Sequence, residues 1–163
     1  MSEPAASKQK VDPVAEPSSE RESGTFICSR DTLDGAYPAH ILAINAVRLG
    51  MDATIFYTFM GINVILKGGA ARCKFVPSGP MGAIPGMSAV ASWMMRKKIY
   101  KAGIPTLDEL MEVAQLEGVK FVACKMTIDM MGLHQEDFIE GVEIQTAEGY
   151  LKHARNCRIN MFT

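Results

Sequence analysis

Apolar stretches and polar breaks alternate along the chain and divide it into short strands and helices. Runs such as 52–59 and 119–124 are rich in β-branched and aromatic residues and have the length of buried strands. The apolar spacing of 38–49 and 106–118 is instead typical of helices that bury one side. The expected strands are 25–29, 52–59, 119–124, 142–144 and 158–162, and the expected helices are 38–49, 62–66, 87–100, 106–118 and 146–154.

Several of these helices carry residues that favour helix ends. Pro38 fits a first turn, where its missing N–H costs little, and Gly50 fits a C-terminal cap. Thr106 and Glu109 have the spacing of a capping box. Because strands and helices alternate, we expect an α/β fold with a mainly parallel five-stranded sheet and helices on both faces, a three-layer sandwich.

Two segments lack this periodicity. Residues 1–24 are rich in Ser, Glu and Pro, and we expect a disordered tail there, followed by a single domain at 25–163. Residues 70–88 are interrupted by Pro and Gly and predict a long loop, either a functional lid or a poorly ordered segment. The stretch 81–95 is nearly uncharged but too short and interrupted to span a membrane, so we expect it to be buried at a subunit contact.

The composition argues against several classes of function. A net charge of −1 disfavours nucleic acid as the main partner. The four cysteines form no C-x-x-C pair and the glycines form no phosphate-binding loop, so we expect no metal and no cofactor. The N-terminus lacks the pattern of a signal peptide, which predicts a cytoplasmic protein with reduced thiols.

Cys124 is the strongest candidate for chemistry. It ends the strand 119–124, and reactive groups gather at the carboxyl ends of parallel strands. We expect Thr127 to cap a helix that begins just after it, and Lys125 adds a neighbouring cation. Both features would favour the thiolate, which is the nucleophilic form. On position alone, however, a buried strand end explains Cys124 equally well.

The other cysteines and histidines are weaker candidates. Cys28 also ends a strand and is either a core residue or a resolving thiol, whereas Cys73 opens the irregular loop. Cys157 precedes the last strand at the opposite edge of the sheet, where packing explains it best. His134 follows Cys124 by ten residues and either approaches the thiol as a base or lies in a solvated turn.

Three stretches of the chain resemble the DsrE/DsrF/DsrH-like family, and in particular its soluble DsrE-like members, which are often labelled peroxiredoxin-like. The most specific part is the block Ala-Cys-x-Met-Thr-x-Asp-x-Met-Gly, which surrounds Cys124. The resemblance extends over about residues 24–163. The stretches that carry it are 29–34, 50–61 and 119–132, and 141–144 and 160–162 also fit.

This resemblance implies both a fold and a chemistry. The implied fold is an α/β sandwich over a mainly parallel five-stranded sheet, assembled as a homo-oligomer (a trimer, a tetramer or larger). The implied function is that of a sulfur carrier or sulfurtransferase, in which Cys124 accepts sulfane sulfur as a persulfide or thiosulfonate and passes it on. The implied partners are a TusA-like sulfur carrier and a rhodanese-like donor. Some members use a second cysteine a few residues later, but here none occurs before Cys157.

Two other functions stay open at this point. A non-catalytic oligomeric binding or assembly module would use 81–95 as its interface, and Cys124 would be dispensable. A thiol peroxidase would turn over peroxide with a reductant, but the sequence lacks both a resolving cysteine beside Cys124 and a peroxidatic motif.

Overall fold

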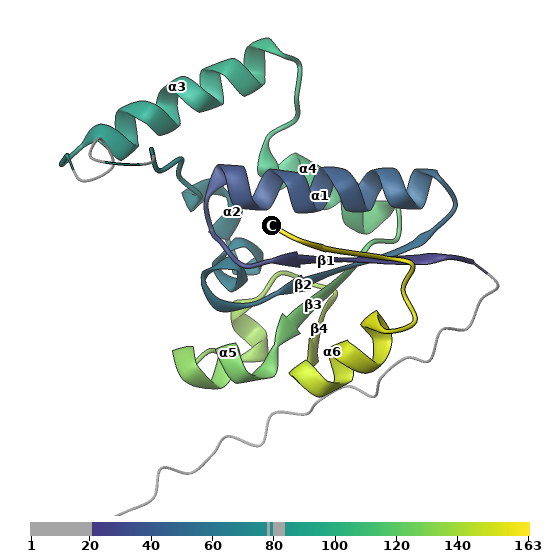
Figure 1. Ribbon diagram of the computed structural model, residues 1–163. Coiled ribbons are helices and arrows are strands. Elements are labelled where there is room, and N and C mark those ends of the chain that lie inside the picture. Colours follow the sequence, from purple (N-terminus) through teal and green to yellow (C-terminus); the bar gives the residue numbers. More distant parts are fainter. Residues whose placement is uncertain (1–20, 78, 80–83) are drawn as a thin grey trace, which may run out of the picture.

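One parallel sheet forms the centre of the protein. The computed structural model describes residues 21–77, 79 and 84–163. Its five strands lie in the order β4-β3-β2-β1-β5, and all neighbours are parallel. The α/β fold with helices on both faces is therefore confirmed (Figure 1). The strands are β1 (Ser23–Cys28), β2 (Asp52–Tyr57), β3 (Lys120–Cys124), β4 (Val142–Gln145) and β5 (Ile159–Phe162).

The start of the sheet differs slightly from the expected start. Strand β1 begins at Ser23, so the last residues of the expected tail belong to the sheet. Of the rest of that tail, residues 1–20 lie outside the described residues.

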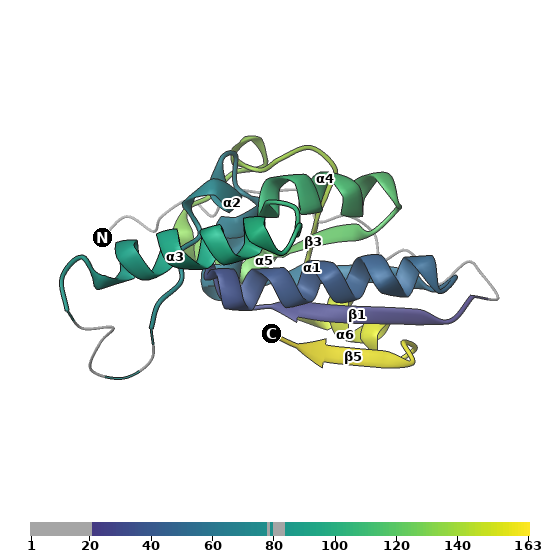
Figure 2. The ribbon, with the colours of Figure 1, turned by 90° about the horizontal axis from the view of Figure 1, so that it is seen from above.

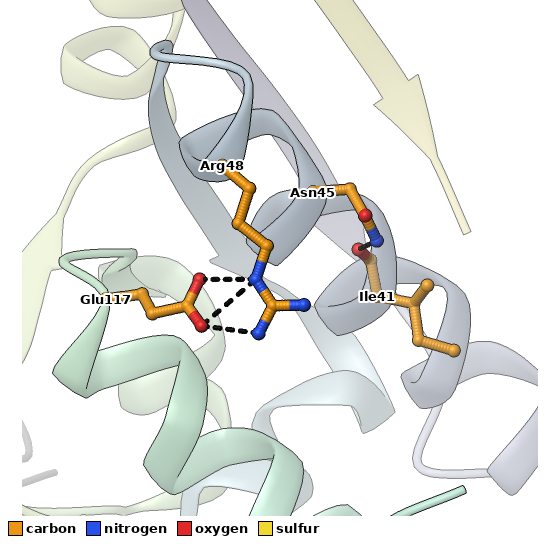
Figure 3. Close-up of polar contacts among 4 residues, drawn as sticks. All are labelled: Ile41, Asn45, Arg48 and Glu117. Atoms are coloured by element: carbon orange, nitrogen blue, oxygen red, sulfur yellow. Dashed lines mark hydrogen bonds and ion pairs between the residues drawn. The ribbon is translucent and has the colours of Figure 1, made fainter.

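Helices α1 (Leu33–Arg48) and α4 (Leu107–Leu116) cover one face of the sheet (Figure 1). Small buried residues such as Ala36, Ala39 and Ala43 allow the α1 backbone to pack closely on the strands. At the C-terminal ends of the two helices, the Arg48 guanidinium donates to both carboxylate oxygens of Glu117, with Nε 3.0 Å from Oε2 (Figure 3). This face holds most of the buried apolar residues.

The first turn of α1 was predicted wrongly. The helix begins at Leu33 after Thr32, so Pro38 lies inside the helix and not in its first turn. A proline at this position cannot donate a hydrogen bond to the carbonyl of Asp34. We expected Pro38 in the first turn because proline favours helix starts. Helix α1 instead begins earlier and lacks one backbone hydrogen bond close to its N-terminal end.

Helices α5 (Lys125–Met131) and α6 (Ala147–Ala154) lie on the opposite face (Figure 1). The apolar cluster on this side is smaller. Its centre is a stacked pair of rings, Phe56 from β2 and Tyr150 from α6, with centroids 4.1 Å apart. We call the side under α1 and α4 the first face, and the side under α5 and α6 the second face.

Among the residues that the structure describes, the connections contain four further helices. The prediction of a helix over 87–100 is confirmed by α3, although this helix stands apart from the sheet (Figure 1) and buries only Ala91 and Ser92. The short α2 lies inside the stretch expected to be irregular, and a 3-10 helix replaces the expected helix at 62–66. These elements are η1 (Phe59–Ile65), α2 (Gly69–Arg72), α3 (Met87–Lys101) and η3 (Gln135–Asp137). Within the described ranges, no helix is long and apolar enough to cross a membrane.

Candidate functional site

Cys124 is the last residue of β3 and also the residue that precedes α5. Its backbone is extended, at φ −73° and ψ 116°, and the helix begins directly after it at Lys125. The side chain points toward the second face, where it packs with Val122, Phe56 and Tyr150 and is only 2% exposed. The thiol therefore lies at the carboxyl edge of the sheet, where the sequence predicted it.

Thr127 does not have the predicted role of helix cap. Since α5 begins at Lys125, Cys124 itself occupies the capping position, and within the described residues its thiol makes no capping hydrogen bond. The Thr127 hydroxyl instead accepts a hydrogen bond from the backbone N–H of Phe59, at 3.1 Å. It also lies 3.4 Å from the hydroxyl of Thr58. Through these hydrogen bonds, Thr127 links α5 to the segment that follows β2.

That segment is locally strained. Phe59 has a positive φ of 47°, which non-glycine residues seldom adopt. The hydrogen bond from its N–H to Thr127 helps to hold this conformation. Strained backbone often occurs at functional sites, where the surrounding structure enforces it. Here it lies one strand away from Cys124, because the end of β2 pairs with the end of β3.

Lys125 follows Cys124 directly, but its charge is already paired. Its ammonium group forms a hydrogen-bonded ion pair with the carboxylate of Asp129, one turn further along α5. The carboxylate is half exposed, so the pair lies at the surface of the helix. The expected cationic environment of the thiol is therefore weaker than the sequence alone suggested, because Asp129 offsets much of the charge of Lys125.

His134 lies at the other end of α5 from Cys124. It is exposed, and its backbone N–H donates to the carboxylate of Asp137 at 2.8 Å, at the start of η3. The seven residues of α5 separate it from Cys124, which corresponds to about 10 Å of helix. Of the two interpretations of His134, this position favours the solvated turn.

Cys28 and Cys73 belong to the first face. Because side chains alternate along a strand, Cys28 on β1 points away from the side that holds Cys124. Burial, reinforced by Cys73 and Asp31, raises the pKa of Cys28 to about 12. Burial and then Asp31 raise the pKa of Cys73 to about 11. Each thiol donates to a backbone carbonyl, that of Arg30 or Gly69, so these cysteines behave as core residues.

Cys157 and His153 are in contact, which was not predicted from the sequence. The Cys157 sulfur lies 3.4 Å from His153 Nε2, and the Thr54 hydroxyl lies 3.3 Å from the same nitrogen. The Ser23 hydroxyl donates to the sulfur at 3.4 Å. A spacing of four residues at the end of a helix is the signal that could have revealed the pair.

The charges around His153 come from three strands. Burial lowers the pKa of His153, and Lys120 on β3 lowers it further, whereas Glu143 and Asp52 raise it. The imidazole is therefore mainly neutral near pH 7, so one ring nitrogen is free to accept a proton. Across the described part of the chain, no three His, Cys, Asp or Glu side chains are grouped as a metal site would require.

Most of the chain is similar to known proteins. The model of the DsrE/DsrF/DrsH-like family matches residues 20–162. The sulfur carrier protein DsrE2 of Allochromatium vinosum is 31% identical over 159 residues, which cover 88% of this chain and 99% of that protein. The uncharacterized protein YrkE of Bacillus subtilis is 30% identical over 151 residues, covering 85% of this chain and 94% of that protein.

A solved structure shows a similar fold. The crystal structure of the ychN protein from E. coli aligns with a TM-score of 0.58 at 14% sequence identity, over 88% of this chain and 99% of that one. The fold is thus shared well beyond recognisable sequence similarity. The family model, which matches nearly all the described residues, shows that this chain belongs to the DsrE/DsrF/DrsH-like family.

Proposed function

We propose that this protein is a sulfur carrier in which Cys124 accepts sulfane sulfur and passes it to a partner protein. The single observation that carries the proposal is the position of Cys124 at the junction of β3 and α5, in a chain related to a protein named as a sulfur carrier. The other strand-end thiol, Cys28, points to the opposite face and is held protonated by burial. Cys124 is therefore the better candidate of the two.

The transfer itself is a thiol exchange. The Cys124 thiolate forms a bond to the outer sulfur of a donor persulfide, the donor's S–S bond breaks, and the donor thiolate leaves with the electron pair. The proton released by Cys124 ends on that leaving thiolate. An acceptor thiolate on the carrier protein then attacks the outer sulfur in the same way and restores Cys124. No further oxidant is needed, because the sulfane sulfur arrives already oxidised.

A buried thiol needs an opening before a partner can reach it. Cys124 is buried against Phe56, Val122 and Tyr150 and is followed directly by α5, a helix of only seven residues. Its anchors are Thr127, through the bond from Phe59, and the fully buried Ile128. We expect that docking of a partner displaces this helix, since a short helix with few buried side chains is among the less stable parts of a fold.

Exposed apolar side chains surround this helix. On α5, Met126 and Met130 are 66% and 60% exposed, and Phe59 and Met60 of the adjoining η1 are also exposed. Met126 and Met130 are four residues apart and so share one side of the helix. Flexible methionine side chains adapt to different partner surfaces, so this patch fits the docking of a donor such as a rhodanese-like protein and of an acceptor such as a TusA-like carrier.

The proposal is tested by locating the transferred sulfur within the chain. Trypsin cleaves after Lys120 and Lys125, so Cys124 is recovered in the peptide 121–125. After incubation with a persulfide donor and alkylation of free thiols, we expect this peptide to gain one or more sulfur atoms. The variant C124S should lose sulfur transfer to an acceptor thiol by about 100-fold or more, as when a nucleophile is removed.

A matched substitution on the first face provides the control. The variant C28S removes a strand-end thiol of the same kind and should leave both the loading of peptide 121–125 and the transfer unchanged. If peptide 121–125 stays unmodified in the wild-type protein while the chain still supports transfer, Cys124 is not the carrier residue. If C124S transfers sulfur as fast as the wild type, the proposal is likewise wrong.

We also propose that the protein is a homo-oligomer, with α3 at the interface between subunits. Within the described residues this helix buries only Ala91 and Ser92, while Trp93 is 64% exposed and Val90, Met94 and Tyr100 are exposed too. A group of exposed apolar side chains on a helix that stands apart from the sheet is typical of a surface that another subunit buries. Sedimentation of the intact chain tests this: a purely monomeric protein at micromolar concentration would contradict it.

A further inference from the structure

The amino edge of the sheet carries a second arrangement of a thiol and a base. Cys157 follows α6, and its sulfur lies 3.4 Å from Nε2 of His153, a residue of that helix. Beside them, β1 and β2 begin with Ser23 and Asp52, and Thr54 follows on β2. This site is separate from that of Cys124, which lies at the carboxyl edge.

The imidazole is oriented by a third group. The Thr54 hydroxyl lies 3.3 Å from His153 Nε2, so the nitrogen that faces the sulfur is also held from the strand side. A nucleophile within hydrogen-bond reach of a base, with the base oriented by a further side chain, is the arrangement that activates cysteine in enzymes. Both states of the ring suit the pair, because neutral Nε2 takes the thiol proton and protonated Nε2–H donates to the thiolate.

The sulfur has an additional donor on its other side. Ser23 donates its hydroxyl hydrogen to Cys157 at 3.4 Å. A hydrogen bond to sulfur stabilises the thiolate more than the thiol, because the anion is the stronger acceptor. The Cys157 thiol also lies 3.5 Å from the His153 carbonyl oxygen, much as the Cys28 and Cys73 thiols lie near carbonyl oxygens of their own. What distinguishes Cys157 is the imidazole nitrogen and the hydroxyl beside its sulfur.

We propose that Cys157 and His153 form a second nucleophilic site, which takes up sulfane sulfur from small donors independently of Cys124. The choice of sulfane sulfur as the substrate rests on the proposed function, whereas the nucleophilic character of Cys157 rests on the contacts above. We choose a small donor because Cys157 is only 8% exposed and, unlike Cys124, is followed by a strand of the sheet and not by a short helix that a partner could displace. Inorganic polysulfide meets this requirement, and a protein donor does not.

The step balances without an added oxidant. The Cys157 thiol gives its proton to His153 Nε2, and the thiolate forms a bond to a sulfur atom inside the polysulfide chain. The neighbouring S–S bond of the polysulfide breaks, and the shorter sulfide leaves with the electron pair and takes the proton back from Nε2. The cysteine sulfur is oxidised and the leaving sulfide is reduced.

Direct exchange between the two thiols is excluded by distance. Thr54, beside the Cys157 site, pairs with Lys120, and Cys124 lies four residues further along β3. Four residues of strand span about 13 Å. The stacked rings of Phe56 and Tyr150 lie on the same face, in the cluster that contains Cys124. The two sites therefore load and unload separately.

The experiment measures the two cysteines in different peptides. Trypsin releases Cys157 as the peptide 156–158, distinct from the peptide 121–125 that holds Cys124. In the folded variant C124S, we expect iodoacetamide to alkylate Cys157 at least about 10-fold faster than in C124S/H153Q at pH 7. After incubation with sodium tetrasulfide, peptide 156–158 of C124S should gain sulfur, and in C124S/H153Q this gain should fall by a similar factor.

The pH profile separates a base from a merely structural histidine. With His153 present, alkylation should begin at a lower pH than in H153Q, and the profile should respond to the groups that face the ring, namely Lys120, Glu143 and Asp52. The variant H134Q changes an exposed histidine elsewhere and should alter nothing at Cys157. Equal rates and equal profiles with and without His153 would overturn the proposal, as would alkylation of Cys157 that requires unfolding.

The outcomes keep the two proposals apart. Sulfur on peptide 121–125 but not on 156–158 would overturn the second site and leave the first intact. Sulfur on peptide 156–158 alone would overturn the proposal for Cys124 and leave the second site intact. If alkylation of Cys157 depends on His153 but tetrasulfide never loads it, a nucleophilic site is present and its assignment to sulfane sulfur is wrong, so the proposal as stated fails.

Discussion

The two faces of the sheet hold the same kind of residue in different chemical settings. On the first face, Cys28 and Cys73 are buried under α1 and its neighbours and donate to carbonyl oxygens, and their pKa values are raised to about 12 and about 11. On the second face, Cys124 opens a short helix and Cys157 contacts an imidazole and a hydroxyl. All four thiols are buried. The two thiols proposed as reactive therefore differ from the first-face thiols not in burial but in position, at the start of a helix for Cys124 and beside an imidazole and a hydroxyl for Cys157.

The sharpest test of this difference is the reactivity of the first-face thiols. A rise of the pKa from 9.0 to about 12 or about 11 lowers the thiolate fraction near pH 7 by about 10³-fold for Cys28 and about 10²-fold for Cys73. We expect alkylation of the native protein to be slowed by at least these factors relative to a free thiol, as measured by peptide mass spectrometry.

Unfolding provides the control for this measurement. In concentrated urea all four cysteines should react at similar rates, because the burial that raises the pKa values is lost. In the native protein, the rates at Cys28 and Cys73 should climb only as the pH approaches 11 to 12. Rapid alkylation of Cys28 or Cys73 in the native protein at pH 7 would contradict the prediction that the first-face thiols are unreactive.

A second prediction concerns the buried histidine of the first face. His40 Nδ1–H donates to the Ala36 carbonyl at 2.7 Å, and its Nε2 accepts from the Tyr57 hydroxyl at 2.8 Å. Burial lowers the pKa of His40 to about 4. Between pH 6.5 and pH 4, His40 is protonated in the unfolded chain but not in the folded chain. The contribution of His40 to the free energy of unfolding is therefore fully present above pH 6.5 and falls by about 3 kcal/mol as the pH decreases to 4.

Urea unfolding across this pH range measures the loss. The variant H40Q cannot titrate and should remove most of the slope between pH 6.5 and pH 4, although it also lowers the stability at pH 7. The variant H134Q, which changes an exposed histidine, should retain the slope. An unchanged slope in H40Q would show that other groups, and not His40, carry the acid sensitivity.

The smallest expected effect comes from a matched pair of Tyr→Phe substitutions, one on each face. Y57F leaves the Nε2 of fully buried His40 without a donor and should cost about 2 kcal/mol. Y150F removes the acceptor of the Thr25 hydroxyl, a hydrogen bond between two neutral hydroxyls, and should cost about 1 kcal/mol. Urea unfolding at pH 7 compares the two. A larger loss for Y150F would contradict the expectation that the Tyr57–His40 hydrogen bond contributes more stability than the Thr25–Tyr150 hydrogen bond.

The sequence predicted the regular parts of the fold because their signals are local. Strand β3 follows from a short apolar run, and the start of α4 follows from the capping box, in which the Thr106 side chain accepts from the Glu109 N–H and the Glu109 carboxylate accepts from the Thr106 N–H. The parallel sheet follows from the alternation of elements. The position of Cys124 at a strand end follows from the same pattern.

The wrong predictions concern side-chain contacts, which a local sequence pattern does not determine. Thr127 looked like a cap, but the helix starts two residues earlier and its hydroxyl serves Phe59 instead. The pairing of Lys125 with Asp129 reduced a charge that the sequence presented as free. The contact of Cys157 with Ser23 joins residues 134 positions apart, so no pattern along the chain could predict it.

The pairing of the last strand with the first has a consequence for how the protein is made. Strand β5 lies beside β1 (Figure 2), and Thr163 exchanges backbone hydrogen bonds with Ser29 and Ile27. Such long-range pairing raises the contact order and slows folding. During synthesis β1 emerges early but must wait for residues 157–163, so its edge stays open until translation of this region is complete. The Cys157 site, built from both ends of the domain, is therefore among the last features to form on the ribosome.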